Sequence, residues 1–395
     1  SMTGCNSRIT IQQSKISNPN PLRGVGFEPS GRINLFLKRT LARYAMNLCT
    51  PLLAPAVALS VLLGNYSVAK EVTITENDKQ IVIETPHLTA TIRKEGYVSG
   101  VAGGSFVDKK TGFRDVGFGL DIVDWIMESG SDKAYADKLP DHMVYQFGNA
   151  YHGKTPKRSI EGPQICTKAG RVDSKVTQAD YFTVVELSYA YTLAAPGRKT
   201  GSKWTQTLVF PHDKRYFISS DRIDAVNSSD AMFLRIDMPG HIKHAQGDTI
   251  SEIYLSYHGR IPAKEFTDDF APDAKFNYRR DRLRKESNDL PDRFIRAYRV
   301  RNPETGKDGP WLAGMTLDPS VVHEAWCHQR GYVCMIEEFG GEPVKAGESF
   351  GAAFIVGWFD DLDAMHKTYD KHRGHRGLTV DGDRWQLTRE IPVDR

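Results

Sequence analysis

Side chains able to do chemistry are concentrated in one stretch of the chain, between Val322 and Glu338. Two runs rich in β-forming residues flank the dipeptide Arg330-Gly331, a pattern typical of a hairpin. On adjacent strands of a hairpin, side chains on one face lie close together and can converge on one ligand. The residues expected to contact a polar ligand such as a sugar are His323, Trp326, His328, Arg330 and Tyr332, with Trp311 from an earlier strand.

The aromatic residues of this set have two interpretations. Trp311, Trp326 and Tyr332 could form a platform on which sugar rings stack. They could equally be buried in the core, which is the commoner fate of large aromatic side chains. The sequence leaves both interpretations open.

His323, Glu324 and His328 raise the question of a metal site. Their spacing is His-Glu-x-x-x-His, whereas a zinc-binding helix carries His-Glu-x-x-His. A helix here would also conflict with Gly331 and with the β-branched residues around it. We therefore expect no catalytic metal and no cofactor, while a structural divalent cation stays open.

Two tetrapeptides share the form Tyr-His-Gly-basic. They are Tyr151-His152-Gly153-Lys154 and Tyr257-His258-Gly259-Arg260. If both lie in loops that face one groove, they offer what β-elimination from a uronic acid needs. These needs are a base, an acid for the leaving oxygen, and a cation for the carboxylate. Each tetrapeptide could also be a plain loop with an aromatic anchor and a turn glycine.

The first 69 residues have the features of a leader that contains a signal peptide. Lys38, Arg39 and Arg43 form a positive region, residues 48–63 are apolar, and Ser67-Val68-Ala69 supplies the small residues that a signal peptidase reads. The apolar run is short for a membrane span and contains two prolines. We expect cleavage after residue 69, export to the periplasm or the extracellular space, and no membrane contact afterwards.

The leader also accounts for the positive charge of the chain. The whole chain has 52 Lys and Arg against 49 Asp and Glu, a net charge of +3. Seven of the basic residues and one acidic residue lie in residues 1–69, which leaves 45 basic against 48 acidic residues, a net charge of −3. The charge therefore does not indicate nucleic acid as a partner.

Residues 276–301 are rich in arginine, with acidic residues between the basic ones. This segment could be a solvated loop with local ion pairs. It could also form a rim that holds an acidic glycan. Nucleic acid is disfavoured because an exported protein seldom meets it and the segment has no nucleic-acid-binding motif.

Three cysteines remain after residue 69: Cys166, Cys327 and Cys334. A hairpin that turns at Arg330-Gly331 would place Cys327 opposite Cys334. A cross-strand disulfide is then possible in an exported protein, and two free thiols are the alternative.

Short segments rich in Val, Ile and Thr dominate the chain from residue 70 onward. One helix is indicated, capped by Asp360 or Asp361 and ended by Gly374. No internal repeat and no βαβ rhythm is found. The sequence predicts an all-β fold, a large antiparallel super-sandwich with few short helices, as one domain over residues 70–380 followed by a C-terminal tail over 381–395.

The order of these elements resembles the galactose mutarotase-like super-sandwich superfamily, which includes sugar epimerases and domains of glycosidases and polysaccharide lyases. The resemblance runs from residue 72 to residue 358. The motifs that carry it are Gly-Tyr-Val-Ser-Gly at 96–100, Trp-Thr-Gln-Thr-Leu at 204–208, Asp-Lys-Arg-Tyr-Phe at 213–217, Leu234 to His241, and Ile336 to Phe350.

In the epimerase branch of that superfamily a mid-chain histidine is the general acid and a late glutamate is the general base. By position, His241 resembles the first, and Glu337, or Glu338 beside it, resembles the second. Opening a sugar ring requires one proton removed from the anomeric hydroxyl and one given to the ring oxygen, which such a pair supplies.

The function predicted from these observations is an exported carbohydrate-active protein, most simply a polysaccharide lyase that cleaves next to a uronic acid by β-elimination. Its partner would be an acidic polysaccharide or oligosaccharide. The alternatives are a sugar epimerase that uses His241 and Glu337, and a glycan-binding protein without catalysis. The catalytic candidates are Tyr151, His152, His241, Tyr257, His258 and Glu337, with Arg260 or Arg330 as the carboxylate clamp.

Overall fold

The computed structural model describes residues 72–131, 136–140, 143, 156–244, 248–266, 276–280, 290–329 and 331–392. The described residues do not include the leader, Tyr151, His152 or Arg330. The predictions made for these residues therefore stay predictions. None of the helices in the described part of the chain is long and apolar enough to span a membrane.

Two large sheets form the fold, and every strand pairing among the described residues is antiparallel. The first sheet has nine strands, in the order β16 (Gly259–Pro262), β15 (Ile250–Leu255), β18 (Ile295–Arg301), β19 (Asp308–Thr316), β22 (Ser349–Phe359), β13 (Tyr216–Asp224), β12 (Lys203–Pro211), β10 (Phe182–Ala190) and β9 (Asp173–Gln178). The second has seven, in the order β11 (Leu193–Ala194), β8 (Lys157–Gly162), β7 (Ile122–Ser129), β14 (Ser229–Asp237), β21 (Val333–Val344), β20 (Val322–Gln329) and β17 (Tyr278–Arg279).

Smaller elements complete the fold. A four-stranded sheet contains β1 (Thr73–Glu76), β2 (Gln80–Glu84), β3 (Leu88–Arg93) and β5 (Val107–Asp108). Two strand pairs are β4 (Val101–Ala102) with β6 (Gly119–Leu120), and β23 (Gly377–Asp381) with β24 (Arg384–Thr388). The helices are α1 (Ile165–Lys168) and α3 (Leu362–His372), with 3-10 turns at Ala136–Lys138, Ala263–Phe266 and Pro319–Val321. Strand β24 lies within the segment expected to form a tail.

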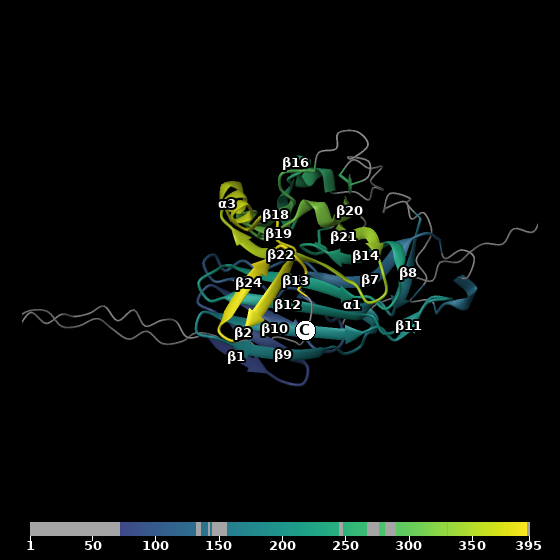
Figure 1. Ribbon diagram of the computed structural model, residues 1–395. Coiled ribbons are helices and arrows are strands. Elements are labelled where there is room, and N and C mark those ends of the chain that lie inside the picture. Colours follow the sequence, from purple (N-terminus) through teal and green to yellow (C-terminus); the bar gives the residue numbers. More distant parts are fainter. Residues whose placement is uncertain are drawn as a thin grey trace, which may run out of the picture. The chain divides into compact units, whose positions relative to one another are not determined.

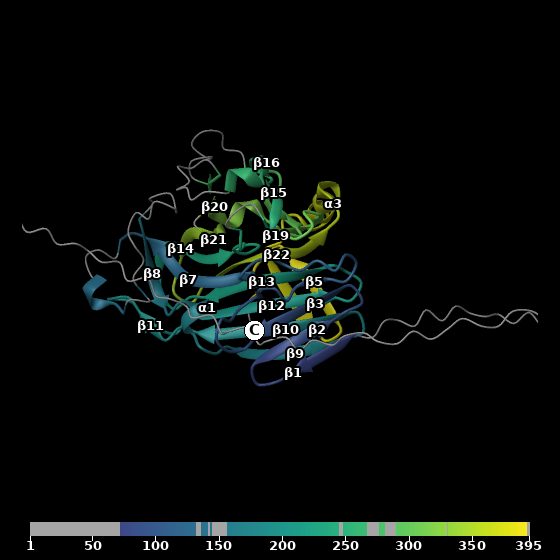
Figure 2. The same ribbon diagram turned by 180° about the vertical axis from the view of Figure 1, so that it is seen from behind.

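The main core lies between the nine-stranded sheet and the other two sheets. It joins Ile83 and Ile92 of the four-stranded sheet and Leu234 of the seven-stranded sheet to Leu208 and Val356 of the nine-stranded sheet. In Figure 2, strands β2 and β3 lie in front of β10 and β12, which agrees with these contacts. The all-β sandwich predicted from the sequence is confirmed.

A second apolar cluster covers the outer face of the nine-stranded sheet. Met365 and Tyr369 of α3 and Leu378 and Leu387 of the β23–β24 hairpin pack there against the sheet. Figure 1 shows α3 and this hairpin beside β22 and β13. Helix α3 begins where the sequence predicts, because the Asp361 carboxylate accepts a hydrogen bond from the Ala364 backbone N–H at 2.8 Å.

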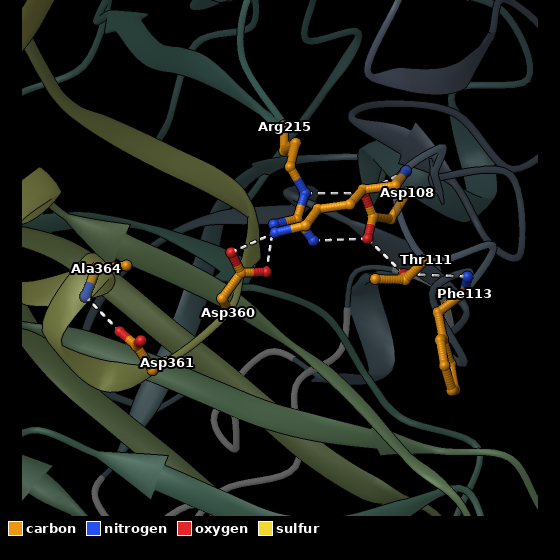
Figure 3. A network of polar contacts seen from close by, with 8 residues as sticks. Asp108, Thr111, Phe113, Arg215, Asp360, Asp361 and Ala364 are labelled. Carbon is orange, nitrogen blue, oxygen red and sulfur yellow. Dashed lines mark hydrogen bonds and ion pairs between the residues drawn. The ribbon is translucent and has the colours of Figure 1, made fainter.

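Arg215 joins two loops that are distant in the sequence (Figure 3). Its guanidinium donates to both carboxylate oxygens of Asp108, at 2.8 and 2.6 Å, and to Asp360 at 2.7 Å. Asp108 is fully buried, and its carboxylate also accepts from the Thr111 hydroxyl. The bidentate pair therefore neutralises a carboxylate that has no access to water.

We expect Arg215→Ala to lower the free energy of unfolding by about 3 kcal/mol, because it leaves the Asp108 charge buried without a cation. Lys110→Ala is the matched control: Lys110 contacts the exposed Asp360 at 2.7 Å and should contribute less than about 1 kcal/mol. Urea unfolding followed by circular dichroism measures both. Equal losses in the two variants would contradict the assignment.

Two carboxyl groups, of Asp121 and Asp221, meet inside the main core. Both residues are fully buried, and the Trp204 indole N–H donates to Asp221 at 2.7 Å. Burial raises the pKa of Asp121 to about 6, and burial together with the neighbouring Asp121 raises the pKa of Asp221 well above its ordinary value. The folded chain thus keeps protons that the unfolded chain loses near the ordinary aspartate pKa.

Because the folded state binds more protons, this pair stabilises the fold at acidic pH, and the contribution of Asp121 is lost as the pH rises from about 4 through 6. Each unit of pKa shift corresponds to about 1.4 kcal/mol. We expect Asp121→Asn to flatten the decline in unfolding free energy between acidic and neutral pH. Denaturant unfolding at a series of pH values, with exposed Asp230→Asn as control, measures this. An unchanged slope in the Asp121 variant would contradict the prediction.

Candidate functional site

A cavity of about 330 Å³ lies on the outer face of the seven-stranded sheet, the face turned away from the main core. Aromatic rings and titratable side chains share its wall, as in many sites that bind polar ligands. Its lining includes Tyr97, Phe118, Asp124, Trp125, Gln164, Cys166, Asp237, His241, Tyr332, Cys334 and Ile336.

Alternation along β14 decides which side chains reach this face. Leu234 and Ile236 belong to the main core, so Arg235 and Asp237 point the opposite way. Asp237 is the last residue of the strand, and His241 follows four residues later. The Asp237 carboxylate at the end of the strand and the His241 imidazole in the segment after it therefore both line the cavity.

Backbone pairing beyond the strand ends fixes the loop residues of the cavity. The Phe118 N–H donates to the His241 carbonyl at 3.0 Å, and the Ile242 N–H donates to the Val333 carbonyl at 2.8 Å. On the other side, the N–H groups of Gly96 and Val98, which flank Tyr97, donate to carbonyls in and after α1 at 2.8 and 3.0 Å. Hydrogen bonds therefore hold the segments around Tyr97, Phe118, His241 and Val333 in place around the cavity.

His241 is the residue of this cavity best suited to proton transfer. Its Nδ1 lies 2.5 Å from the Asp237 carboxylate, and its side chain keeps 13% of its exposure. Burial opposes its charge, but Asp237 and Cys334 outweigh burial and raise the pKa of His241 well above its ordinary value. The imidazole is thus held as a cation, with Nδ1 occupied by Asp237 and with Cys334 as a second side-chain partner.

Asp124 supplies a second carboxyl group with a shifted pKa. The Gln164 amide donates to it at 2.6 Å and the Cys166 thiol at 3.2 Å. Burial and the neighbouring Asp237 raise the pKa of Asp124 to about 6. The cavity therefore contains an acid, His241, and a carboxylate that ionises just below neutral pH.

Beside the cavity, the same sheet face carries a buried ionic cluster. Lys157 Nζ lies 2.8 Å from Glu324 and 2.5 Å from Glu338, and 4.0 Å above the Trp326 ring. The Arg235 guanidinium lies 2.6 Å from Glu338. Burial lowers the pKa of Lys157, whereas Lys157 and Arg235 outweigh burial and lower the pKa of Glu338, so each buried charge depends on its partners.

Among the predicted site residues, the structure brings His241 and Tyr332 together in the cavity. Their rings meet edge to face, with centroids 5.3 Å apart. Trp326 and His328 lie on the same sheet face, opposite Ile336 and Cys334 of β21. Both are buried.

His323 lies further along the same strand, and its ring stacks on Phe233 with centroids 5.0 Å apart. Its predicted partner Glu324 pairs with Lys157 and with Arg279 instead of sharing a ligand with it. No group of three or more metal-ligating side chains with suitable geometry occurs among the described residues.

The structure separates Glu337 from His241, in contrast to the predicted acid–base pair. Glu337 points into the core, where the Thr316 hydroxyl donates to it at 2.6 Å. Burial raises its pKa to about 7. Its neighbours Ile336 and Glu338 face outward, because side chains alternate along β21. Glu338, the other candidate, pairs with Lys157 and Arg235 and does not line the cavity.

The Tyr257 motif and Trp311 lie elsewhere. Tyr257 packs on Phe294 with ring centroids 5.1 Å apart. His258 is exposed, and Arg260 pairs with Glu252 at 2.5 Å. Trp311 is buried in the cluster on the outer face of the nine-stranded sheet, so of its two interpretations packing is the one observed. These residues cannot act together with His241.

The three cysteines in the described part of the chain, Cys166, Cys327 and Cys334, are free thiols. The turn between β20 and β21 spans residues 330–332, one residue longer than predicted, and Cys334 therefore faces His328 while Cys327 faces Met335. Cys327 points into the main core and Cys334 into the cavity. A disulfide between them is excluded in this register.

Sequence reasoning missed Asp124, Asp237, Tyr97 and Phe118. A usable signal was present for Asp237, which precedes His241 by four residues after an alternating strand. Asp121 and Asp124 lie on opposite sides of the seven-stranded sheet, Asp121 in the core and Asp124 in the cavity. Tyr97 and Phe118 reach the cavity only through long-range backbone pairing.

No protein-family profile and no curated protein matches the chain. Solved structures similar to it include galactose 1-epimerase from Lactobacillus acidophilus, with 8% identity, 73% of this chain and 99% of that chain covered, and a TM-score of 0.36. They also include heparan sulfate lyase from Pedobacter heparinus, with 11% identity, 80% and 42% covered, and a TM-score of 0.35. A TPR-domain containing protein from Parabacteroides distasonis has 11% identity, 72% and 48% covered, and a TM-score of 0.34.

The chain spans less than half the length of the last two of these structures. The first two belong to enzyme classes that the sequence resemblance names. At such TM-scores and identities they assign no residue a role, so the roles below rest on the geometry of the cavity.

Proposed function

We propose that this chain is an exported carbohydrate-active enzyme that carries out acid–base chemistry on a sugar bound in the His241 cavity. The observation that carries the proposal is the Asp237–His241 pair next to Asp124 in a cavity walled by aromatic rings. The raised pKa of His241 keeps it protonated as an acid, and the pKa of Asp124, about 6, leaves it ionised as a base at neutral pH. The rings of Trp125 and Tyr332 suit the apolar faces of a sugar.

The reaction that needs only these groups is the opening and closing of a sugar ring, as in an epimerase. His241, held as a cation by Asp237, would donate a proton to the ring oxygen. Asp124, ionised at neutral pH, would accept the proton of the anomeric hydroxyl. Asp124 thus takes the role that the sequence assigned to Glu337.

A polysaccharide lyase is the second candidate, favoured by Tyr97 and Tyr332 next to His241 in the same cavity. β-Elimination also needs a cation at the carboxylate of the reacting uronate. The described lining of this cavity has no Lys or Arg, and Arg260 lies on the other large sheet. The ring-opening reaction therefore agrees better with the geometry.

The test combines two assays on one panel of saccharides. Nuclear magnetic resonance exchange spectroscopy detects anomer or epimer interconversion of free sugars, and ultraviolet absorbance detects the unsaturated uronates that a lyase releases. If the unmodified protein interconverts anomers or epimers and the Asp124→Asn variant does not, the epimerase is supported. If both the unmodified protein and the Asp124→Asn variant release unsaturated product, the lyase is supported. Tight binding with neither product would support a glycan-binding protein and overturn the enzyme proposal.

The pH dependence of kcat/KM follows from the two pKa shifts. Activity requires ionised Asp124 and protonated His241, so we expect a bell-shaped profile. Its acidic limb should lie near pH 6, set by Asp124, and its basic limb well above the ordinary histidine pKa. An acidic limb near pH 4 would exclude Asp124 as the base.

A further inference from the structure

A second cavity, of about 280 Å³, adjoins the His241 cavity. Tyr97 and Phe118 line both, so the two cavities share one wall. Apart from these rings and two small residues, the second cavity is lined by Arg93 and Lys243. Its charged side chains are thus both basic, whereas the His241 cavity has Asp124 and Asp237.

Both cations are exposed and available to a ligand. Arg93 ends strand β3, and Lys243 follows His241 by two residues. Among the described residues, no carboxylate lies within ion-pair distance of either. They differ in this respect from Lys157 and Arg235, whose charges are already neutralised by buried glutamates.

Phe118 forms the ridge between the cavities. It keeps 42% of its exposure, which is unusual among the large apolar residues of this chain, and Lys243 Nζ lies 5.0 Å above its ring. The Phe118 ring meets Tyr332 with centroids 5.5 Å apart. The backbone next to Phe118 is closely packed, because the Lys243 N–H donates to the Val116 carbonyl at 2.9 Å and a Cβ at Gly103 would lie 2.7 Å from the Phe118 backbone.

We propose that the second cavity is an anion-binding subsite for a saccharide that carries a carboxylate, sulfate or phosphate group. The anionic group binds between Arg93 and Lys243, and its sugar ring lies against Phe118. The adjoining sugar enters the His241 cavity, where the carboxylates Asp124 and Asp237 would repel an anion. This last step rests on the proposed function, whereas anion binding at Arg93 and Lys243 does not.

Equilibrium binding by isothermal titration calorimetry tests the subsite. The probes are uronate-containing and sulfated disaccharides, each paired with its neutral parent, together with the anionic monosaccharides and inorganic sulfate. We expect the intact protein to prefer at least one anionic disaccharide over its neutral parent by about tenfold, because two exposed cations would face its anionic group. The preference should shrink at high salt.

The double variant R93Q/K243Q should lose that preference and still bind the neutral parent as the unmodified protein does. R384Q/K307Q, which removes two exposed cations that line neither cavity, is the matched control and should keep it. The absence of a preference in every pair, or an equal preference in R93Q/K243Q, would overturn the proposal. Inorganic sulfate that binds as tightly as the disaccharide would overturn the saccharide part of it.

The monosaccharide probes test whether the ligand fills both cavities. A disaccharide with its anionic group on one ring only should bind more tightly than the isolated anionic monosaccharide, because both cavities are filled. Equal affinities would contradict the two-cavity arrangement. His241→Ala should keep the preference for the anionic disaccharide over its neutral parent, so a failure of the proposed chemistry and a failure of the subsite give different results.

Discussion

His241→Ala is expected to lower kcat/KM roughly a hundredfold to ten-thousandfold, the range associated with loss of a general acid or base. The imidazole is the one cationic side chain in the described lining of its cavity, and Asp237 holds it in its protonated form. Substrate binding should change far less, because the aromatic walls remain. The loss should therefore appear in kcat more than in KM.

The control for this prediction is Glu337→Gln. Glu337 is the sequence-based candidate for the base, but it lies on the opposite face of β21 and contacts Thr316 in the core. We expect E337Q to keep the activity of the unmodified protein once circular dichroism shows that it is folded. A large loss of activity in folded E337Q, with H241A fully active, would reverse the assignment of the site.

The Asp237→Asn variant tests whether the charge of Asp237 sets the pKa of His241 or whether Asp237 only holds the structure. Asparagine fills the same space but removes the charge that raises the pKa of His241. The basic limb of the pH–rate profile should then move toward the ordinary histidine pKa, whereas a purely structural role for Asp237 would leave the limb in place. Asp237 is thus a positioning residue, and the pH profile is the readout that identifies it.

The sequence predicts the fold class and the hairpin well because both depend on local patterns. Alternating runs and turn residues mark the strands, and Gly331 adopts the left-handed conformation (φ +68°) that a tight turn between β20 and β21 requires. The helix that ends at Gly374 is predicted for the same reason, from its cap and its stop residue.

The orientation of β21 could not be predicted, because both of its faces are covered. Met335 and Phe339 pack in the main core, while Ile336 and Cys334 form the cavity wall, so apolar residues do not alternate along the strand. Without alternation, the choice between Glu337 and Glu338 depends on the register, and one extra turn residue reverses it. His241, which the resemblance suggests as a candidate, lies in the cavity with Asp237, the last residue of β14.

The other missed residues share a different cause. Tyr97 and Phe118 lie in short connections, and only their hydrogen bonds to α1 and to residues 241–243 bring them to the site. Such pairings join segments more than a hundred residues apart in the case of Phe118, and no local pattern encodes them. The acidic cavity and its basic neighbour therefore emerge only from the three-dimensional structure.

The largest loss of stability is expected from Lys157→Met, at about 3–5 kcal/mol of unfolding free energy. The substitution keeps the length of the side chain but leaves Glu324 and Glu338, both buried, without the ammonium group that lies 2.8 and 2.5 Å from them. Arg235 still neutralises part of the Glu338 charge and Arg279 part of the Glu324 charge, so the two glutamates should share the penalty. Lys175→Met, from an exposed cross-strand pair with Glu186, is the matched control and should cost less than about 1 kcal/mol.

If the penalty arises from an uncompensated charge, removing that charge should restore stability. The double variant K157M/E324Q should therefore be more stable than K157M alone, although Glu324→Gln by itself destabilises the fold. Chemical denaturation of all four proteins in this double-mutant cycle gives the coupling energy between Lys157 and Glu324. Additive losses would mean that Lys157 acts through its packing on Trp326, 4.0 Å away, and not through its charge.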